Sequence, residues 1–450
     1  MAIFPRKEDL TTPGVFQYIR QSKTSKKRIH LRIDEDGHGT LLINANRIFH
    51  FNPSATLMAH AILENIPEKT IIEKIIKRYD VNRNQAHHDF LDFSQQLSMI
   101  ISPDEEICPI CDLNVDVSMP FSKNPTAPYR MDLALTYICN NDCAHCYNIR
   151  PRTEKELTTE QWKQLLDKIW GLGIPHVVFT GGEPTVRNDL VELITYAEKT
   201  GFITGLNTNG RLLMEKEFVD KLCHAGLDHV QITLESQNNK IHDEIVNRSG
   251  AWEETIQGIQ NALNSSLFVM TNTTLLINNS HQLESLLLFL GEIGVPTVGL
   301  NGLIHSGRGK NFLGGIPEAN LPHLLDIAKN ITTQQEQRLI WYTPTQYCHF
   351  DPVMMELGVK GCTAALYNMC VEPNGNVIPC QSYYHSLGNL LHDSWDSIWN
   401  HELAIHIRER KYISDKCKSC AVLQECGGGC PLYQKENGSI YPEKMLEIHY

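Results

Sequence analysis

The residues best suited to chemistry are three closely spaced cysteines, Cys139, Cys143 and Cys146, in the stretch C-N-N-D-C-A-H-C. Three thiolates at this spacing can hold three irons of a cubane iron–sulfur cluster. The stretch offers no cysteine to the fourth iron, and an open iron can bind a substrate or a cosubstrate. A zinc knuckle and three buried structural thiols are the alternatives.

A second motif, Gly181-Gly182-Glu183-Pro184, follows a predicted strand about 35 residues after the last of these cysteines. Glycine lets a backbone approach a ligand closely, and the Glu183 carboxylate can accept hydrogen bonds from an ammonium group. Together the two motifs resemble the signature of the radical S-adenosylmethionine (SAM) superfamily. The resemblance implies a SAM-binding [4Fe–4S] cluster that cleaves SAM reductively to a 5′-deoxyadenosyl radical.

Further residues match SAM-contacting positions of that superfamily. The resemblance implies that the turn at Asn209 shapes the cavity and that Tyr147 helps to shield the adenine, next to His145. Arg248 would pair with the SAM carboxylate through its planar fork, and a surface arginine is the alternative.

Thr233 and Glu235 lie where relatives carry Ser-Leu-Asp-Gly. The resemblance implies that the Thr233 hydroxyl contacts the SAM carboxylate and that Glu235 contacts the ribose. Because Glu235 is followed by Ser236, this chain departs from the usual pattern, and ribose binding stays open.

A second cysteine array lies near the end of the sequence. Cys362 is followed after twelve residues by Gly375 and after four more by Cys380, and the pattern C-x2-C-x5-C-x3-C comprises Cys417, Cys420, Cys426 and Cys430. The array resembles the SPASM domain of peptide-modifying radical SAM enzymes, which carries one or two auxiliary [4Fe–4S] clusters. A zinc ribbon is the alternative.

The SPASM resemblance implies two ligand sets. The first auxiliary cluster would use Cys348, Cys362, Cys380 and Cys430. The second would use Cys417, Cys420, Cys426 and a later cysteine, but no cysteine follows Cys430 in the sequence. Its fourth ligand therefore stays open between Cys370, Cys108, Cys111, a non-cysteine ligand and an unliganded iron. No catalytic side chain is assigned, because Gln381 stands where some relatives carry an aspartate base.

The elements that position these motifs alternate between strand and helix over residues 128–310. Predicted strands cover residues 133–137, 177–180, 203–207, 229–234, 270–276 and 297–300. Predicted helices cover residues 160–172, 189–199, 215–225, 252–265 and 282–293. Continuous apolar strands between helices predict a parallel α/β sheet. The radical SAM resemblance makes it a partial (β/α)6 barrel, with reactive groups at the carboxyl ends of the strands.

Two further segments flank this core. Residues 1–101 contain short alternating strands followed by three predicted helices, and the order resembles a winged-helix, PqqD-like recognition element for ribosomally made, modified peptides (RiPPs). A generic winged-helix module is the alternative. Residues 102–127 are proline-rich and predict a linker, and residues 311–450 form the SPASM segment.

Charge and composition exclude several classes of protein. The net charge is −12 and no basic stripe stands out, so we expect no nucleic-acid partner. No apolar run is long enough to span a membrane, and the first residues lack the apolar core of a secretion signal. Fourteen cysteines clustered at short spacings indicate metal in a reducing compartment, so we expect a cytoplasmic protein.

The resemblances together predict a radical SAM/SPASM enzyme that oxidatively modifies a peptide or protein carrying a leader sequence. Its electron donor would be a ferredoxin or a flavodoxin. Three alternatives stay open: a tetrapyrrole- or cofactor-processing enzyme of the haem d1 type, a maturase of a partner enzyme, and a non-catalytic iron–sulfur electron-transfer protein.

Overall fold

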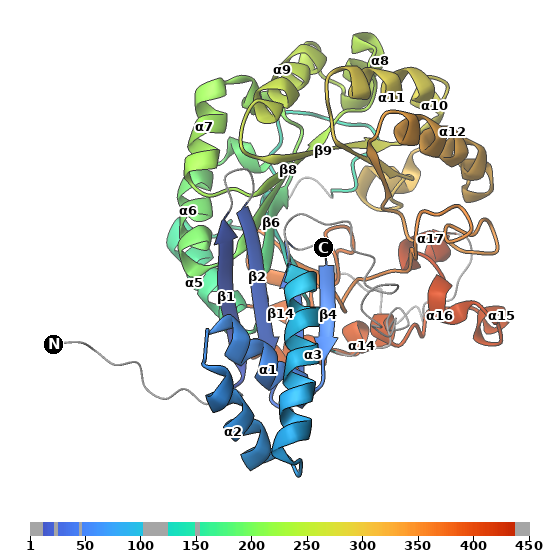
Figure 1. The fold of residues 1–450 in the computed structure, drawn as a ribbon. Coiled ribbons are helices and arrows are strands. Elements are labelled where there is room, and N and C mark those ends of the chain that lie inside the picture. The colour runs from blue at the N-terminus through green and yellow to red at the C-terminus, as the bar shows by residue number, and fades with distance from the viewer. Residues whose placement is uncertain (1–11, 22–25, 45–46, 102–124, 149–153, 437–450) are drawn as a thin grey trace. The chain divides into compact units, whose positions relative to one another are not determined.

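The computed structural model describes residues 12–21, 26–44, 47–101, 125–148 and 154–436 (Figure 1). The chain divides into two compact units, one of residues 1–118 with 169–175 and one of residues 119–168 with 176–450. Cys108, Cys111 and most of the predicted linker lie outside the described residues. Within the described residues, no helix combines the length and apolar content of a membrane span.

The first unit is a four-stranded antiparallel sheet in the order β1-β2-β3-β4, followed by three helices. The elements are β1 (Gly14–Gln21), β2 (Lys26–Ile33), β3 (Gly39–Ile43), β4 (Arg47–Phe51), α1 (Pro53–Leu63), α2 (Glu68–Arg78) and α3 (Arg83–Ile101). The Asn52 side chain caps α1 by accepting a hydrogen bond from the Ala55 backbone amide. Pro53 occupies the first turn, where its missing N–H costs nothing.

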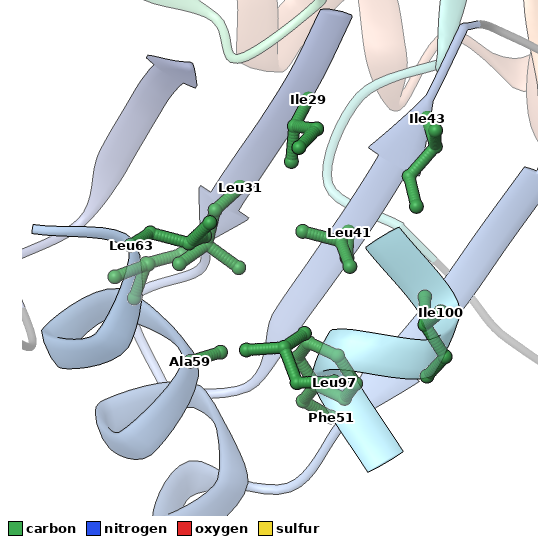
Figure 2. Close-up of a cluster of buried hydrophobic side chains, with 10 residues drawn as sticks. Ile29, Leu31, Leu41, Ile43, Phe51, Ala59, Leu63, Leu97 and Ile100 are labelled. Atoms are coloured by element: carbon green, nitrogen blue, oxygen red, sulfur yellow. The ribbon is translucent and has the colours of Figure 1, made fainter. Parts of the chain in front are cut away.

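The core of this unit lies between one face of the sheet and the helices, and Figure 2 shows it. Alternate residues of β2 and β3 supply it, because a strand presents every second side chain to one face. Ala59 and Leu63 come from α1, and Leu97 and Ile100 come from α3. Each fully buried leucine or isoleucine contributes about 1.5–3 kcal/mol of burial free energy.

The sequence analysis located three of these strands and all three helices, but it missed β1. The strand pairs with β2 over its whole length, from Gly14 opposite Ile33 to Gln21 opposite Lys26. The fold class of this unit as winged-helix, and its kinship to PqqD, stay predictions.

The second unit is built on a ten-stranded mixed sheet in the order β11-β10-β9-β8-β7-β6-β5-β12-β13-β14. Its strands are β5 (Arg130–Thr136), β6 (His176–Gly181), β7 (Ile203–Thr208), β8 (His229–Thr233), β9 (Phe268–Thr274), β10 (Thr297–Asn301), β11 (Arg338–Trp341), β12 (Asn368–Val371), β13 (Asn376–Ile378) and β14 (Gly388–Asn389). Strands β5 to β11 are parallel to their neighbours. The predicted α/β class is confirmed, and closure into a partial barrel stays a prediction.

Helices connect these strands and lie around the outside of the sheet, with α6 and α7 on the left of the view and α10, α11 and α12 on the right (Figure 1). They are α5 (Thr159–Gly171), α6 (Leu190–Thr200), α7 (Lys216–His224), α8 (Asn239–Val246), α9 (Ala251–Leu263), α10 (Ile277–Ser280), α11 (Leu283–Glu292) and α12 (Leu321–Gln334). Short 3-10 helices are η1 (Pro184–Val186), η2 (Arg211–Met214), η3 (Gly307–Asn311) and η4 (Glu318–Asn320). All predicted strands of the core coincide with strands of this sheet, whereas α8, α12 and β11 were not predicted.

The cysteine-rich C-terminal segment contributes to the same sheet. Strand β12 pairs in parallel with β5, and β13 and β14 continue the sheet in antiparallel fashion. Five short helices complete the described chain: α13 (Trp395–Trp399), α14 (Glu402–Arg408), α15 (Asp415–Lys418), α16 (Leu423–Cys426) and α17 (Pro431–Glu436). The first strand of the core is therefore interior to the sheet rather than an edge.

Candidate functional site

The three motif cysteines lie in the loop that leaves the carboxyl end of β5, and we call residues 137–148 the cluster loop. Burial is the largest cause of the strongly raised pKa of the Cys143 thiol, and the charge of Cys146 adds to it. The charge of Cys139 acts in the same direction. The Asn141 backbone N–H also donates to Cys139 Sγ at 3.4 Å. The residues therefore fit a cluster, whose iron would replace the thiol protons.

The two glycines of the GGEP motif allow the sheet to meet the cluster loop. A Cβ on Gly181 would lie 2.2 Å from the Thr136 carbonyl oxygen, and one on Gly182 would lie 2.4 Å from the Ile138 carbonyl oxygen. The Gly182 and Glu183 amides donate to those same two carbonyls at 2.7 and 2.9 Å. Only glycine allows this approach, and it continues the β5–β6 pairing up to the first cysteine.

Glu183 is buried and links its own motif to the turn after β7. Its Oε1 accepts from the Thr208 hydroxyl at 2.7 Å and from both the amide and the hydroxyl of Thr185. Its Oε2 accepts from the Asn209 amide at 2.7 Å. The pKa of Glu183 is raised, because the effect of burial outweighs that of these hydrogen bonds, which lower it. The carboxylate thus fixes two turns of the site, and its contact with SAM stays a prediction.

The turn after β7 also holds the cluster loop directly. The Asn209 side chain donates to Asn140 Oδ1 at 2.6 Å. The guanidinium of Arg211 donates to the Asn140 carbonyl at 2.7 Å and to Asn141 Oδ1 at 3.0 Å, and it is paired with Glu254. The sequence analysis missed Arg211, although it comes directly after the Thr-Asn-Gly turn. Its planar fork suits this double contact.

Two backbone segments complete the support of the loop. From the end of α8, the carbonyls of Val246 and Ile245 accept from the amides of Asp142 and Ala144. From η3, the Arg308 amide donates to the Cys146 carbonyl at 2.8 Å. The Arg308 guanidinium also binds Asp142 Oδ1 at 2.7 Å.

The same two segments contain a predicted SAM ligand and a further glycine. Arg248 is exposed just beyond α8, two residues from Val246, and its pairing with SAM stays a prediction. In η3, a Cβ on Gly307 would lie 2.4 Å from the Tyr147 carbonyl oxygen. The close approach of this segment therefore also requires glycine.

His145, next to the predicted adenine contact Tyr147, lies beside Glu235, the predicted ribose contact. His145 Nε2 lies 3.2 Å from Glu235 Oε1, and Glu235 Oε2 accepts from the Thr274 amide at 2.9 Å. Glu235 is buried, and its charge acts on Cys143. Thr233, at the end of β8, is half-buried. The structure therefore brings Glu235 to the cluster loop but gives both of its oxygens protein partners.

Tyr147 and Asn148 connect the loop to the cysteine-rich segment. Burial raises the pKa of the Tyr147 hydroxyl, and the charge of Cys146 raises it further. The Asn148 side chain donates to the Gly181 carbonyl at 2.8 Å and accepts from the Tyr384 hydroxyl at 2.6 Å. The Asn148 side-chain amide thus joins the GGEP motif to Tyr384, which lies four positions after Cys380.

Burial raises the pKa of several thiols in the C-terminal cysteine segment. Burial raises the pKa of Cys362, and the charges of Cys430 and Cys380 raise it further. These three residues match the first predicted ligand set. Burial also raises the pKa of Cys348, but the thiols that act on it are Cys426 and Cys417. The ligand sets of the auxiliary clusters, Cys348 included, stay predictions.

Two further described cysteines are Cys370 and Cys223. Cys370, on β12, is fully buried and packs against Ala134, Tyr137 and Ile378, which agrees with a packing role. Its thiol is near Cys380, whose charge contributes to its raised pKa after burial, Asp132 and Glu372. Cys223, on α7, is half-buried.

Comparison with known proteins agrees with this geometry. Residues 133–290 match the Radical SAM superfamily, and residues 362–421 match SPASM, an iron-sulfur cluster-binding domain. The chain is 27% identical over 322 residues to AdoMet-dependent heme synthase of Methanosarcina barkeri, covering 67% of this chain and 91% of that one. It is 28% identical over 334 residues to mycofactocin maturase MftC of Mycolicibacterium smegmatis, covering 69% and 80%.

Among solved structures, Streptococcus suis SuiB shares the fold. Its complex with precursor peptide SuiA aligns with a TM-score of 0.68 and 17% identity, over 94% of this chain and 98% of that one. Its complex with SAM aligns with a TM-score of 0.67 and 18% identity, over 93% and 97%.

The class of protein follows from these domains and the site. The chain combines a radical SAM domain with a SPASM domain. It is an enzyme of the SPASM subfamily of radical SAM enzymes, and its cofactors are SAM, a SAM-binding [4Fe–4S] cluster and auxiliary clusters.

Proposed function

We propose that this enzyme is a RiPP-type maturase that oxidatively modifies a peptide carrying a leader sequence. The supporting observation is the fold shared with SuiB over 94% of the chain, in a structure of SuiB bound to its precursor peptide. The mycofactocin maturase among the relatives also supports a role as a maturase.

The first unit would grip the leader as a PqqD-like recognition element. A peptide in extended conformation can add itself to the edge of a sheet, using backbone hydrogen bonds for affinity and side-chain contacts for specificity. We assign this role to β4, an edge strand of the described sheet. Its Ile48 side chain is 41% exposed, and the Arg47 guanidinium lies 5.4 Å from the Phe49 ring centre. Because successive side chains of a strand face opposite sides of the sheet, β4 offers a leader an apolar contact on one face and a positive charge on the other.

The second unit would carry out the chemistry, with Cys139, Cys143 and Cys146 holding the core cluster. When bound, the cofactors supply a 5′-deoxyadenosyl radical that takes a hydrogen atom from the peptide, and an auxiliary-cluster acceptor for the remaining electron. The protein's own part is to fix the cluster loop through Glu183, Asn209 and Arg211. An external ferredoxin or flavodoxin would supply the electron that starts each turnover.

A tetrapyrrole-processing enzyme is the second candidate function, and the heme synthase relative favours it. Under that function the first unit would have no peptide to bind. A maturase of a partner enzyme differs from the main proposal only in the size of its substrate.

The test uses the full chain, reconstituted anaerobically with iron and sulfide, and short peptides encoded beside its gene. We expect a leader-bearing peptide to bind and to lose hydrogen, as measured by fluorescence anisotropy and mass spectrometry. Ile48→Asp should weaken peptide binding at least tenfold while leaving peptide-free SAM cleavage unchanged. The matched control is Ile19→Asp on the opposite edge strand β1, where the side chain is 45% exposed.

Equal losses in the two variants would reject β4 as the leader site. Binding of an iron porphyrin, with no binding of any neighbouring peptide, would support the tetrapyrrole alternative instead.

A further inference from the structure

The chain enters the cluster loop through an irregular end of β5. Pairing between β5 and β6 shifts register between Ala134 and Thr136, so Leu135 lies at a bulge. Leu135 is fully buried, and a buried carbonyl that leaves the ladder of a sheet needs another hydrogen-bond partner. That partner is Arg187, three residues after Pro184 of the GGEP motif, whose Nη1 donates to the Leu135 carbonyl oxygen at 3.0 Å.

The same guanidinium holds the chain where it returns from the cluster loop. Arg187 Nη1 and Nη2 both donate to the Leu157 carbonyl oxygen at 3.4 Å, and Glu156 Oε2 lies 3.6 Å from Nη1. Through Nε and Nη2, Arg187 also forms a two-point pair with Asp189, at 2.8 and 2.7 Å. A planar group with five donors can serve all of these acceptors at once, which a lysine ammonium cannot.

Glu156 joins the two ends of the loop directly. Its Oε1 accepts from the Thr136 hydroxyl at 2.6 Å and from the Tyr137 amide at 3.3 Å. Thr136 and Glu156 are 20 positions apart in the sequence, so this contact closes the loop at its base. We call residues 135–137, 156, 157 and 187 the neck of the cluster loop.

The neck is also fixed to the turn between β12 and β13. The Leu157 amide donates to the Pro373 carbonyl at 2.7 Å, and the Tyr137 hydroxyl donates to the buried Glu372 carboxylate at 2.9 Å. The neck therefore has partners on both neighbours of β5 in the sheet, the β6 side through Arg187 and the β12 side through this turn.

We propose that Arg187 and Glu156 are positioning residues of the core cluster. They set the direction in which the cluster loop leaves the sheet, and so they set where the loop presents its three cysteines to SAM. A misplacement of about 1 Å between reacting groups can cost about a hundredfold in rate. The role concerns SAM cleavage itself and does not depend on which substrate follows.

The neck is separate from the contacts that hold the middle of the loop. Those contacts come from Arg211, from the carbonyls at the end of α8 and from the Arg308 amide, and they reach residues 140–146. Loss of the neck should therefore leave the cysteines able to bind iron while changing how the loop is placed. This separation distinguishes a positioning role from a general requirement for folding.

The main test is Arg187→Met in the full chain, reconstituted anaerobically with iron and sulfide. We expect the kcat of dithionite-driven 5′-deoxyadenosine formation to fall at least tenfold, with the KM for SAM changed less than about threefold. The iron content should equal that of the parent, and the change that SAM causes in the electron paramagnetic resonance of the reduced cluster should differ. Arg338→Met, at an exposed position on β11, is the matched control and should alter none of these.

Two results would overturn the proposal. One is an Arg187→Met enzyme with the parental kcat and the parental resonance. The other is a loss of iron in parallel with the loss of activity, because Arg187 would then be needed to bind the cluster rather than to place it.

A milder pair of variants covers the case in which Arg187→Met fails to fold. Glu156→Gln keeps a side-chain oxygen that can accept from Thr136 and Tyr137, whereas Glu156→Ala does not. We expect Glu156→Gln to keep the parental kcat and Glu156→Ala to lower it several-fold. In the iron-free chain, backbone amide exchange at Tyr137 should rise at least tenfold in Glu156→Ala alone. Equal kcat and equal exchange in the two variants would reject the proposal.

Discussion

The cluster loop and the C-terminal cysteine segment both gather thiols for iron, but they are held in different ways. Backbone contacts to the cluster loop come from distant parts of the chain: the Asp142 amide bonds Val246, and the Cys146 carbonyl accepts from Arg308. The amides of Cys417 and Cys420 bond only to residues three positions earlier. The sheet therefore shapes the first site before any metal binds. In the second, Cys426 Sγ accepts from the distant Tyr347 amide, but the turns of Cys417 and Cys420 depend on local bonds and on their metal.

This difference matches the work proposed for each site. A loop that must place SAM against an iron needs fixed geometry, because small misplacements of reacting groups cost large factors in rate. Auxiliary clusters that accept an electron need proximity more than fixed orientation.

Replacing the cysteines of each site should separate their roles, and this is the largest expected effect. Replacement of Cys139, Cys143 and Cys146 together by Ala should abolish SAM cleavage, because no ligand for the core cluster remains. Replacement of Cys417 and Cys426 by Ala should leave dithionite-driven SAM cleavage within a few-fold of the parent. Formation of 5′-deoxyadenosine, measured by chromatography, checks both.

SAM cleavage that survives in the triple variant would contradict the assignment of the core cluster. Equal loss in both variants would mean that the two sites are not independent, and the comparison would fail.

A single added methyl group should reveal how rigid the support of the cluster loop is. In Gly182→Ala the new Cβ would lie 2.4 Å from the Ile138 carbonyl oxygen and 2.7 Å from that of Tyr137, so the backbone itself must move. We expect SAM cleavage to fall at least a hundredfold. Gly171→Ala, where nothing lies within 4 Å, is the matched control and should keep full activity. An active Gly182→Ala enzyme would show that the loop tolerates displacement.

The sequence predicted the two motifs of the core because each is contiguous. The cysteine spacing and Gly181–Glu183 can be read locally, and the strands that carry them are apolar throughout. Strand β8 and helix α7 were likewise predictable from their periodicity. Helix α8 (Asn239–Val246) was not, because eight residues make little more than two turns, which is too short a window to establish a helical period.

The remaining support of the site depends on segments that meet only after folding. No local signal places the Arg308 amide at the Cys146 carbonyl or the Tyr347 amide at Cys426 Sγ, because each contact spans many residues.

Removal of iron should raise backbone amide exchange more in the C-terminal cysteine segment than in the cluster loop. In the iron-free chain we expect backbone amide exchange in residues 415–430 to rise at least tenfold, while exchange in the cluster loop rises only a few-fold. The reason is that the amides of Asp142 and Ala144 keep their partners on α8. Hydrogen–deuterium exchange with mass spectrometry, with and without reconstituted iron, measures both. A larger rise in the cluster loop would reverse the comparison.

The smallest expected effect concerns the sheet that carries both sites, at the start of β8. His229 Nε2 lies 3.0 Å from His176 Nε2, and Gly205 leaves room for the His229 ring, since a Cβ there would lie 2.1 Å from it. Burial, and then the charge of Arg130, lowers the pKa of His229 from 6.5 to about 4. Between these values the unfolded chain binds a proton that the folded chain does not.

Stability should therefore be complete above pH 6.5 and fall as the pH drops towards 4, by at most about 1.4 kcal/mol per pH unit. His229→Gln, which cannot titrate, should flatten this part of the profile, whereas His392→Gln at an exposed position should not. Urea unfolding of the iron-free chain from pH 7 to 4.5 measures the difference. The His176–His229 pair lies at the starts of its strands, away from the cysteines. The fall of stability between pH 6.5 and 4 should therefore persist when Cys417 and Cys426 are replaced. A slope that vanished with those cysteines would show that the sheet depends on the metal segment, and the contrast between the two regions would not hold.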